Sequence, residues 1–459
     1  MTRTLEDVFP AKQLKRDADS LVEWGRDWTR NHAPNPCAVV FPESVAQVVE
    51  LVALANAERI ALVPSGGRTG LSGGAVAGNG EVVVSFDRMN RILDFTAEDR
   101  LLTCQAGVVT QSIQDYASAH GLFYPVDFAS SGSSQIGGNI ATNAGGIKVI
   151  RYGLTRDWIA GLRVVTGAGD LLNCNRGLVK NATGYDLRHT FIGSEGTLGF
   201  IVEADVRLAP APQPQRVMVV GISRFRDILR VLAAFQGALT LSAFEFFSEL
   251  ALTKVTAHRQ LRRPLSATTP FYALLEFDAA DSAAAESVFA QVLEADLVSD
   301  GVLSQSEAQA RALWQLREGI SESIAVFHPY KNDLSVRISQ MPDFIDAVEE
   351  LVGRRYPDLE ICWYGHIGDG NLHLNILKPE ALEVAEFYAR CQAVSPEIFA
   401  LVAEREGSIS AEHGVGLLKR DFLSFSRSAA ELSVMAGLKT VFDPNQIMNP
   451  GKLLPVAGS

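Results

Sequence analysis

The stretch DFASSGSSQIGGNIATNAGG, residues 127–146, places serine, threonine and asparagine among closely spaced glycines. Two other segments, PSGGRTGLSGG at 64–74 and FIGSEGTLGFI at 191–201, have a similar composition. Glycine lets backbone N–H groups approach an anion closely, because it has no side chain and its φ angle can be positive. One such segment alone could serve a tight turn. Three of them in one region favour a phosphate-bearing ligand such as a pyrophosphate.

The two common nucleotide-binding fingerprints are absent from this sequence. It contains neither G-x-G-x-x-G nor G-x-x-x-x-G-K-[ST]. A nicotinamide enzyme of the Rossmann type and a P-loop nucleotidase are therefore disfavoured. The glycine-rich half must hold its ligand in another way.

The composition is that of a globular protein with more than one core. The chain has 459 residues, 47% of them hydrophobic, and a formal net charge of −12. That length predicts two domains, and that charge argues against nucleic acid or an anionic membrane as a partner. The N-terminal residues show no signal peptide and no apolar run long enough for a membrane span, so we expect a cytoplasmic protein. The cysteines are dispersed, which argues against a disulfide framework and a thiolate metal site, and stand at Cys37, Cys104, Cys174, Cys362 and Cys391.

Periodicity and turn residues divide the chain into two regions. In 42–63, Ser44 is a candidate N-cap of an amphipathic helix that runs into a buried strand. The proline-rich stretch LAPAPQPQR at 208–216 reads as a linker.

Strands are expected at about 81–86, 101–106, 161–166, 217–222, 271–277, 333–338, 359–366 and 371–377. Helices are expected at about 225–236, 281–297, 306–327, 342–354 and 380–405. The predicted domains are 1–210 for the ligand-binding half, 211–429 for an α+β domain with an antiparallel sheet, and 430–459 for a segment returning to the first.

Histidines concentrate in two short motifs of the second region. In ICWYGHIGDGNLHLNIL, residues 361–377, Asp369-Gly370 predicts a hairpin that places His366 and His373 on neighbouring strands. In SISAEHGVGLLKR, residues 408–420, Glu412 and His413 precede glycines in a predicted loop. Two histidines and a carboxylate form a common site for zinc, manganese, iron or cobalt. The alternative is a pair of histidines that only hydrogen-bond within the hairpin.

A third segment offers cations for a carboxylate. In 312–336, Arg317 and Ser321 are four residues apart and would share a face of a helix, and Lys331 follows on the next element. A guanidinium can bind a carboxylate through two hydrogen bonds. The alternative for Arg317 is an ion pair with Glu318 or Glu322, or contact with solvent.

The glycine-rich motifs PSGGRTG, IGGNIATNAGG and GSEGTLG resemble the FAD-binding half of the vanillyl-alcohol oxidase (PCMH-type) flavoprotein family. The resemblance implies a two-domain α+β fold, with a PCMH-type FAD-binding domain and an antiparallel-sheet substrate domain. Some relatives attach FAD through a histidine in the first loop, where this chain has Arg68, so we expect non-covalent FAD. The implied FAD residues are Pro64, Gly66, Gly67, Arg68, Thr69, Gly70, Ser131, Gly132, Ser133, Gly137, Gly138, Asn139, Thr142, Gly145, Gly146, Glu195, Gly199, Ile201 and Asn449.

The motifs GHIGDGNLHLN and AEHGVGLLKR resemble those of FAD-linked D-2-hydroxyacid dehydrogenases. The resemblance implies that His366, His373 and Glu412 bind a divalent metal, taken to be zinc, and that His413 is the catalytic base. Arg317, Ser321, Lys331, Asn375 and His413 are the implied substrate residues. The pattern LWxLRE…YKxDLS and the stretch SAFEFF at 242–247 resemble most the D-2-hydroxyglutarate dehydrogenases of that family. D-Lactate, glycolate and D-malate are the alternative substrates.

The resemblance also bears on partners. It implies an electron-transfer flavoprotein or a quinone-linked carrier as electron acceptor, with a homodimer as the assembly considered.

Two other classes of function compete with this reading. A metallohydrolase could use the same histidines but gives the glycine-rich half no purpose, and a flavin-binding subunit without chemistry would have no need of His413 and Arg317.

Overall fold

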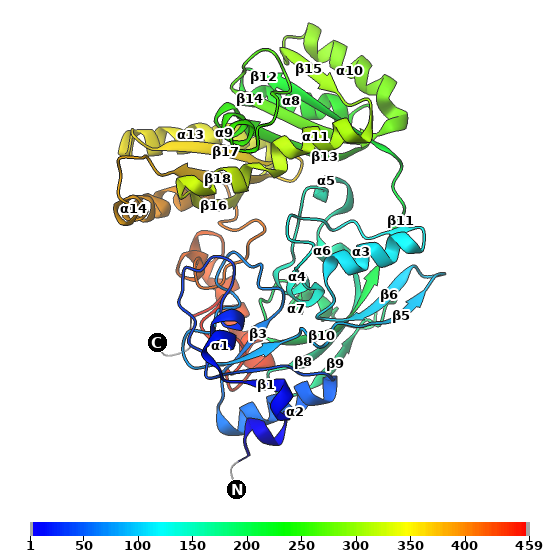
Figure 1. Cartoon of the computed structure of the whole chain (residues 1–459), viewed down its shortest axis with the longest axis vertical. Helices are drawn as coiled ribbons and strands as arrows, with labels where there is room; N and C mark the ends of the chain where they lie inside the picture. The colour runs from blue at the N-terminus through cyan, green and yellow to red at the C-terminus, as the bar shows by residue number, and fades with distance from the viewer. Residues whose placement is uncertain (1–2, 456–459) are drawn as a thin grey trace. The chain divides into compact units, whose positions relative to one another are not determined.

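The computed structural model describes residues 3–455, which divide into two compact units. The first unit contains the residues up to Gly146, Gly153–Ala211 and the segment from Glu412 onward. The second unit contains Ile147–Tyr152 and Pro212–Ala411. In Figure 1 the red C-terminal segment accordingly belongs with the blue N-terminal elements. The expected return to the first unit, at 430, lies later in the chain than the return that the structure has at Glu412.

The first unit is built on two larger sheets. One has the order β1-β2-β4-β3, with β2, β3 and β4 parallel, and the other has the antiparallel order β5-β6-β10-β8-β9. Their strands are β1 (Leu14–Lys15), β2 (Ala38–Val40), β3 (Leu62–Ser65), β4 (Val82–Ser85), β5 (Ile92–Thr96), β6 (Leu101–Gln105), β8 (Ile159–Thr166), β9 (Leu171–Cys174) and β10 (Gly199–Arg207), and a small pair joins β7 (Leu122–Phe123) to β11 (Ala209–Pro210). The helices are α1 (Ala18–Trp24), α2 (Val45–Glu58), α3 (Thr110–Ala119), α4 (Ile136–Thr142), α6 (Thr155–Trp158), α7 (Arg188–Phe191) and α15 (Ala429–Phe442).

Helix α2 and strand β3 bring the first glycine-rich loop to its place. Ser44 accepts a hydrogen bond from the Gln47 N–H at 3.3 Å, so the predicted cap is confirmed. One side of α2 is buried through Val48, Leu51, Val52, Leu54 and Ala55. Strand β3 then lies beside β4 and ends at Ser65, directly before the loop.

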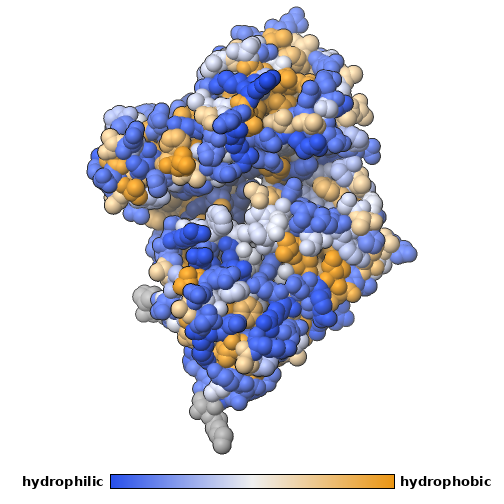
Figure 2. All heavy atoms as spheres, in the orientation of Figure 1, coloured by the Kyte–Doolittle hydropathy of each residue, from blue (hydrophilic) through white to orange (hydrophobic). Residues whose placement is uncertain are grey.

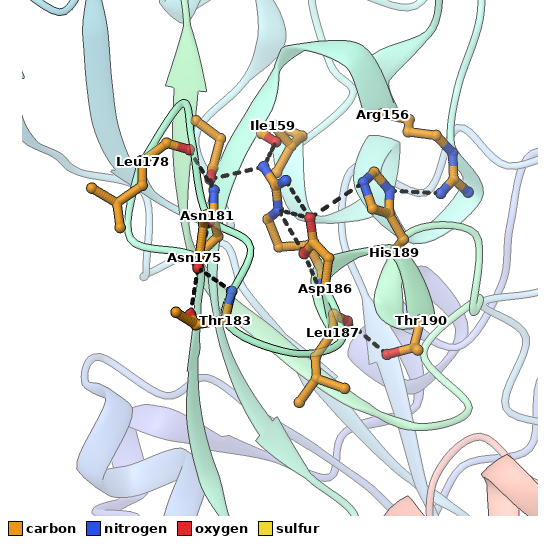
Figure 3. A network of polar contacts seen from close by, with 12 residues as sticks. Arg156, Ile159, Asn175, Leu178, Asn181, Thr183, Asp186, Leu187, His189 and Thr190 are labelled. Atoms are coloured by element: carbon orange, nitrogen blue, oxygen red, sulfur yellow. Dashed lines mark hydrogen bonds and ion pairs between the residues drawn. The ribbon is translucent and has the colours of Figure 1, made fainter.

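A polar network fixes the chain between β9 and the third glycine-rich segment (Figure 3). Arg188, at the start of α7, pairs with Asp186 and donates to the carbonyl oxygen of Ile159 at 2.8 Å. Arg156 donates to Nδ1 of His189 at 2.9 Å. These bonds tie α7 to the start of β8, and α7 leads directly into the glycines that follow it.

The second unit is a seven-stranded antiparallel sheet with helices. Its strand order is β15-β12-β14-β13-β17-β18-β16. The strands are β12 (Gln215–Ile222), β13 (Leu241–Ser248), β14 (Phe271–Asp278), β15 (Asp300–Leu303), β16 (Tyr330–Ser335), β17 (Glu360–His366) and β18 (Asn371–Leu377). The helices are α5 (Val149–Tyr152), α8 (Phe225–Gln236), α9 (Glu249–Arg259), α10 (Ser282–Glu294), α11 (Glu307–Glu318), α12 (Ile320–Ser323), α13 (Met341–Arg355) and α14 (Val384–Ala403).

One face of this sheet packs against α9, α11 and α12. The apolar cluster there joins residues of these helices, among them Leu252 and Leu316, to alternate residues of the strands, among them Val219 and Phe247. Side chains two apart on a strand share a face, so polar residues in the same alternation lie on this face as well. Glu245, His366 and His373 are polar residues of this alternation.

Most predicted elements of the second unit are confirmed, with three corrections. The expected single helix at 306–327 is wrong, because α11 ends at Glu318 and α12 begins after Gly319. The strand expected at 333–338 is Tyr330–Ser335. Strands β13 and β15 and helices α5 and α9 were not predicted. Strand β13 reads as a mostly apolar run that periodicity alone cannot classify.

One face of the surface is mostly hydrophilic and the cysteines form no disulfides, as the composition and the spacing of the cysteines led us to expect. Hydrophilic residues cover most of the face drawn in Figure 2, with hydrophobic ones in scattered groups. All five cysteines are free thiols, and four of them are buried. Among the described residues, no helix combines the length and the apolar character needed to cross a membrane.

Candidate active site

The first unit contains a cavity lined by all three glycine-rich segments. At Gly138 an added Cβ would meet no atom within 4 Å, so the backbone there borders open space. At Gly67 an added Cβ would lie 2.1 Å from the carbonyl oxygen of Ser133, so only glycine allows the first two segments to approach this closely. The cavity therefore presents bare backbone to a ligand, which suits the pyrophosphate of FAD.

The cavity contains most of the FAD residues expected from the sequence. The expected residues that line it are Pro64, Gly66, Gly67, Arg68, Thr69, Gly70, Gly137, Gly138, Asn139, Thr142, Glu195, Gly199 and Ile201. The expected residues outside its lining are Ser131, Gly132, Ser133, Gly145, Gly146 and Asn449. The structure adds Ser72, Gly74, Ala75, Phe86, Ala106, Gln135, Ala141, Gly196 and Phe200.

Two of the expected FAD residues hold the protein backbone in the structure. The Glu195 carboxylate accepts hydrogen bonds from the N–H groups of Val415 and Gly416 at 2.7 and 2.8 Å. Burial raises the pKa of Glu195, and these two N–H groups oppose that shift. The buried Asn449 amide donates to the carbonyl oxygens of Gly74 and Glu195. Both side chains thus fasten the C-terminal segment beside the cavity.

Arg68 places a positive charge on the cavity wall. Its Nη1 lies 3.4 Å from Oδ2 of Asp87, and its guanidinium lies 5.4 Å from the centre of the Trp24 ring. Asp87 also accepts hydrogen bonds from Trp24 Nε1 at 2.8 Å and from Gln135 Nε2 at 2.7 Å. A guanidinium held in this way suits an anionic ligand such as a pyrophosphate.

Gly67→Ala tests the close approach of the first two glycine-rich segments. Because the new Cβ would overlap the Ser133 carbonyl, we expect a loss of about 1–3 kcal/mol in the free energy of unfolding and a purified protein depleted of flavin. Thermal unfolding and the flavin-to-protein absorbance ratio measure both effects. The control is Gly437→Ala on α15, where an added Cβ meets nothing within 4 Å. Equal flavin content in the two variants would contradict the close-approach argument.

In the second unit, four adjacent strands gather polar residues on one face of the sheet (β13, β17, β18 and β16 in Figure 1). Their register places Glu245 opposite His366, and His373 opposite both Tyr364 and Asp333. The predicted hairpin is confirmed, and Gly370 supplies the positive φ angle, +85°, that its turn requires. The two histidines thus lie on neighbouring strands, as expected.

The two imidazoles are oriented toward each other. His366 Nε2 and His373 Nε2 are 3.3 Å apart. On the opposite side of each ring, His366 Nδ1 lies 2.8 Å from Glu245 Oε1 and His373 Nδ1 lies 3.6 Å from Asp333 Oδ1. The Glu245 carboxylate at Nδ1 of His366 favours the proton on that nitrogen, which leaves the Nε2 lone pair of His366 facing Nε2 of His373. Two nitrogen ligands of a tetrahedral zinc ion are also about 3.3 Å apart, so the pair suits a metal.

Beside the histidines, the same face carries the candidate carboxylate-binding groups. Lys331 lies opposite Asn375, and its Nζ donates to Ser321 Oγ at 3.0 Å. Although Lys331 is exposed, the protein around it lowers its pKa by desolvation. Arg317 is buried, with its guanidinium 4.8 Å from the centre of the Tyr364 ring. The break between α11 and α12 therefore does not prevent Arg317 and Ser321 from reaching the same face.

Several residues of this face were missed by sequence reasoning. Glu245 and Asp333 are buried carboxylates, and Arg317 pairs with Glu245 Oε2 at 2.8 Å, so neither Glu318 nor Glu322 is its partner in that ion pair. The pKa of Tyr364 is raised to about 12, chiefly by burial. The two-residue alternation in YKNDLS could have indicated that Asp333 shares a face of its strand with Lys331. Glu245 had no comparable signal, because its strand was not recognised.

Glu412 and His413 begin the segment that returns to the first unit, in a loop as predicted. The residues before them run along β16: the Ser408 N–H donates to the Ser335 carbonyl at 2.7 Å, and the Ala411 N–H donates to the Asp333 carbonyl at 3.3 Å. Asp333 is the residue opposite His373. Glu412 therefore follows directly after the residue that hydrogen-bonds to Asp333 on β16.

Comparison with known proteins identifies relatives over nearly the whole chain. Residues 36–175 match the family described as FAD binding domain, and residues 211–453 match FAD linked oxidases, C-terminal domain. D-2-hydroxyglutarate dehydrogenase of Stutzerimonas stutzeri (strain A1501) is 58% identical over 97% of this chain and 97% of its own length. That of Xanthomonas citri pv. viticola is 53% identical over 98% and 96%, respectively. The solved structure of p-cresol methylhydroxylase with substrate bound superposes with a TM-score of 0.76 at 16% identity, covering 99% of this chain and 96% of that one. The predicted fold class is confirmed.

Proposed function

The chain belongs to the FAD-linked oxidases and, among them, to the D-2-hydroxyglutarate dehydrogenases, and from this premise we propose that it oxidises D-2-hydroxyglutarate to 2-oxoglutarate. Two relatives of that name match it over nearly their whole length. The glycine-lined cavity supports FAD as the cofactor. When bound, FAD supplies the acceptor for the hydride from C2 of the substrate at its N5 atom.

The observation that carries the choice of a diacid is the pair of cations on the sheet face. Among the described residues, the polar partner of the Lys331 ammonium is the neutral Ser321 hydroxyl, so its charge is available to an anionic ligand. The buried Nε of Arg317 has no hydrogen-bond partner among these residues. A buried N–H of this kind needs an acceptor, which the distal carboxylate of a diacid would supply. D-Lactate and glycolate have no such group.

The reacting end of the substrate is assigned to the histidine motifs. His366 and His373 would hold a divalent metal through Nε2, with Glu412 as the third ligand, and zinc suits this donor set. The metal would supply positive charge that lowers the pKa of the 2-hydroxyl group. Asn375 would orient the substrate by hydrogen bonding. His413 would take the hydroxyl proton at an imidazole nitrogen, which leaves the C2–H bond ready to release its hydride.

Lys331→Met tests recognition of the distal carboxylate. We expect kcat/KM for D-2-hydroxyglutarate to fall about 10- to 100-fold, the worth of one charge-assisted hydrogen bond, with D-lactate affected much less. Because Lys331 is exposed and methionine keeps most of its length, the thermal midpoint should barely change. Its lowered pKa gives a second readout, because the charged form is lost as pH rises. In the wild type, kcat/KM for D-2-hydroxyglutarate should therefore decrease as the pH rises, at a pH below the usual pKa range of lysine. The Lys331→Met variant should not show this decrease. Equal losses for D-lactate and the diacid would contradict this role.

Steady-state rates with an artificial electron acceptor test the substrate. We expect D-2-hydroxyglutarate to be used best, D-malate second, and D-lactate, glycolate and the L-enantiomers poorly. A preference for D-lactate or glycolate would replace the proposed substrate by those alternatives. A colourless active protein would favour the metallohydrolase, and a yellow protein inert to every hydroxy acid would favour a non-catalytic flavin subunit. For reoxidation we propose an electron-transfer flavoprotein or a quinone-linked carrier.

A further inference from the structure

Glu245 lies between two groups that serve different ends of the proposed substrate. It is on β13, next to β17, and is only 1% exposed. One carboxylate oxygen, Oε1, lies 2.8 Å from His366 Nδ1, and the other, Oε2, lies 2.8 Å from Arg317 Nη2. A single buried carboxylate therefore touches a candidate metal ligand and a candidate substrate-binding cation.

The two contacts constrain both partners. The bond to Nδ1 fixes the tautomer and ring orientation of His366, so that its Nε2 faces His373. The ion pair, together with the Tyr364 ring, holds the Arg317 guanidinium on one side. With 7% side-chain exposure for Arg317 and 1% for Glu245, solvent does little to screen this pair.

We propose that Glu245 is a positioning residue that couples metal binding at His366 to recognition of the distal substrate carboxylate by Arg317. The inference rests on the proposed function, which assigns the metal and the diacid to these two partners. The negative charge of Glu245 is shared between a guanidinium and an imidazole N–H. When a second carboxylate engages Arg317, Glu245 interacts more strongly with His366, and the basicity of His366 Nε2 rises. Diacid and metal then strengthen each other's binding, and the effect is reciprocal.

The experiment measures Zn²⁺ affinity in the FAD-loaded, metal-depleted protein by competition with a chromophoric chelator. Each titration is made alone, with saturating pyruvate and with saturating 2-oxoglutarate. Both keto acids offer the same groups to the metal, and only 2-oxoglutarate has the distal carboxylate. For the wild type we expect tighter Zn²⁺ binding with 2-oxoglutarate than with pyruvate. For Glu245→Gln we expect affinity to fall about 10- to 100-fold and the difference between the keto acids to disappear.

The matched control is Glu276→Gln. Glu276 is a second buried glutamate, on the neighbouring strand β14, where it accepts from Trp314 Nε1 at 2.9 Å and pairs with Lys148 at 3.2 Å. This variant should retain the wild-type Zn²⁺ affinity and the wild-type difference between the keto acids. If Glu245→Gln does not fold, Glu245→Asp keeps the charge, shortens its reach and is expected to give the same losses.

Unchanged Zn²⁺ affinity in the Glu245 variant would overturn the proposal, as would an unchanged difference between 2-oxoglutarate and pyruvate. These outcomes are separate from failure of the proposed function. If the wild type does not oxidise D-2-hydroxyglutarate, the substrate assignment falls. The Zn²⁺ affinities of the wild type and the two glutamine variants would still decide whether Glu245 supports His366.

Discussion

His413→Ala is expected to lower the rate of flavin reduction by D-2-hydroxyglutarate about 10²- to 10⁴-fold, the usual contribution of a general base. The 2-hydroxyl proton would then leave to water, without a positioned acceptor. Anaerobic stopped-flow absorbance of the FAD-loaded variant measures this step directly. Flavin content should remain that of the wild type, because the cavity lining does not include His413.

The control for this variant is His258→Ala. His258 is an exposed histidine in the last turn of α9, and its removal should leave flavin reduction unchanged. Zn²⁺ content should be equal in both variants, since His413 is assigned to the proton and not to the metal. A normal flavin reduction rate in His413→Ala would remove this residue from the mechanism.

Metal removal is the second change with a large expected effect. His373→Ala deletes one of the two Nε2 atoms that lie 3.3 Å apart, and we expect it to abolish metal retention and to lower turnover at least about 10²-fold. Chelation of the wild type should have the same effect on turnover and should be reversed by added Zn²⁺. The yellow colour should persist in both cases, because no cavity-lining residue is altered.

Elemental analysis of the purified proteins checks this expectation. The wild type and His258→Ala should contain about one equivalent of divalent metal, and His373→Ala should contain much less. Full turnover in a preparation shown to be metal-free would contradict the role of the metal. The two histidines would then be a hydrogen-bonded pair within their hairpin.

The fold could be predicted where local signals are strong. Helix α8 matches its expected bounds, and Asp369-Gly370 identified the hairpin of β17 and β18. Prediction failed where the signal is long-range. Strand β13 contains the mostly apolar run AFEFF, and its pairings with β14 and with β17, the latter more than a hundred residues later, show that it is a strand. Gly319 marked the break between α11 and α12 and was not recognised as a stop.

The candidate site follows the same division. Residues in short motifs, such as His366 and His373, could be identified because two elements adjacent in sequence bring them together. Glu245 could not, since its partners Arg317 and His366 come from two other elements. The FAD residues implied by the resemblance are not all part of the cavity lining. Gly146 packs against the Asp127 backbone, where an added Cβ would lie 1.9 Å from its carbonyl oxygen, and so serves packing outside the cavity lining.

The most direct test of the proposed oxidation is to mix the purified yellow protein anaerobically with D-2-hydroxyglutarate and to follow the flavin absorbance near 450 nm. We expect prompt bleaching by the D-enantiomer, slow bleaching by D-lactate, and no bleaching by L-2-hydroxyglutarate. The absorbance should return on addition of an electron acceptor, with one equivalent of 2-oxoglutarate formed for each flavin reduced. If D-2-hydroxyglutarate leaves the flavin spectrum of the metal-loaded protein unchanged, the protein does not oxidise this substrate and the proposed function is contradicted.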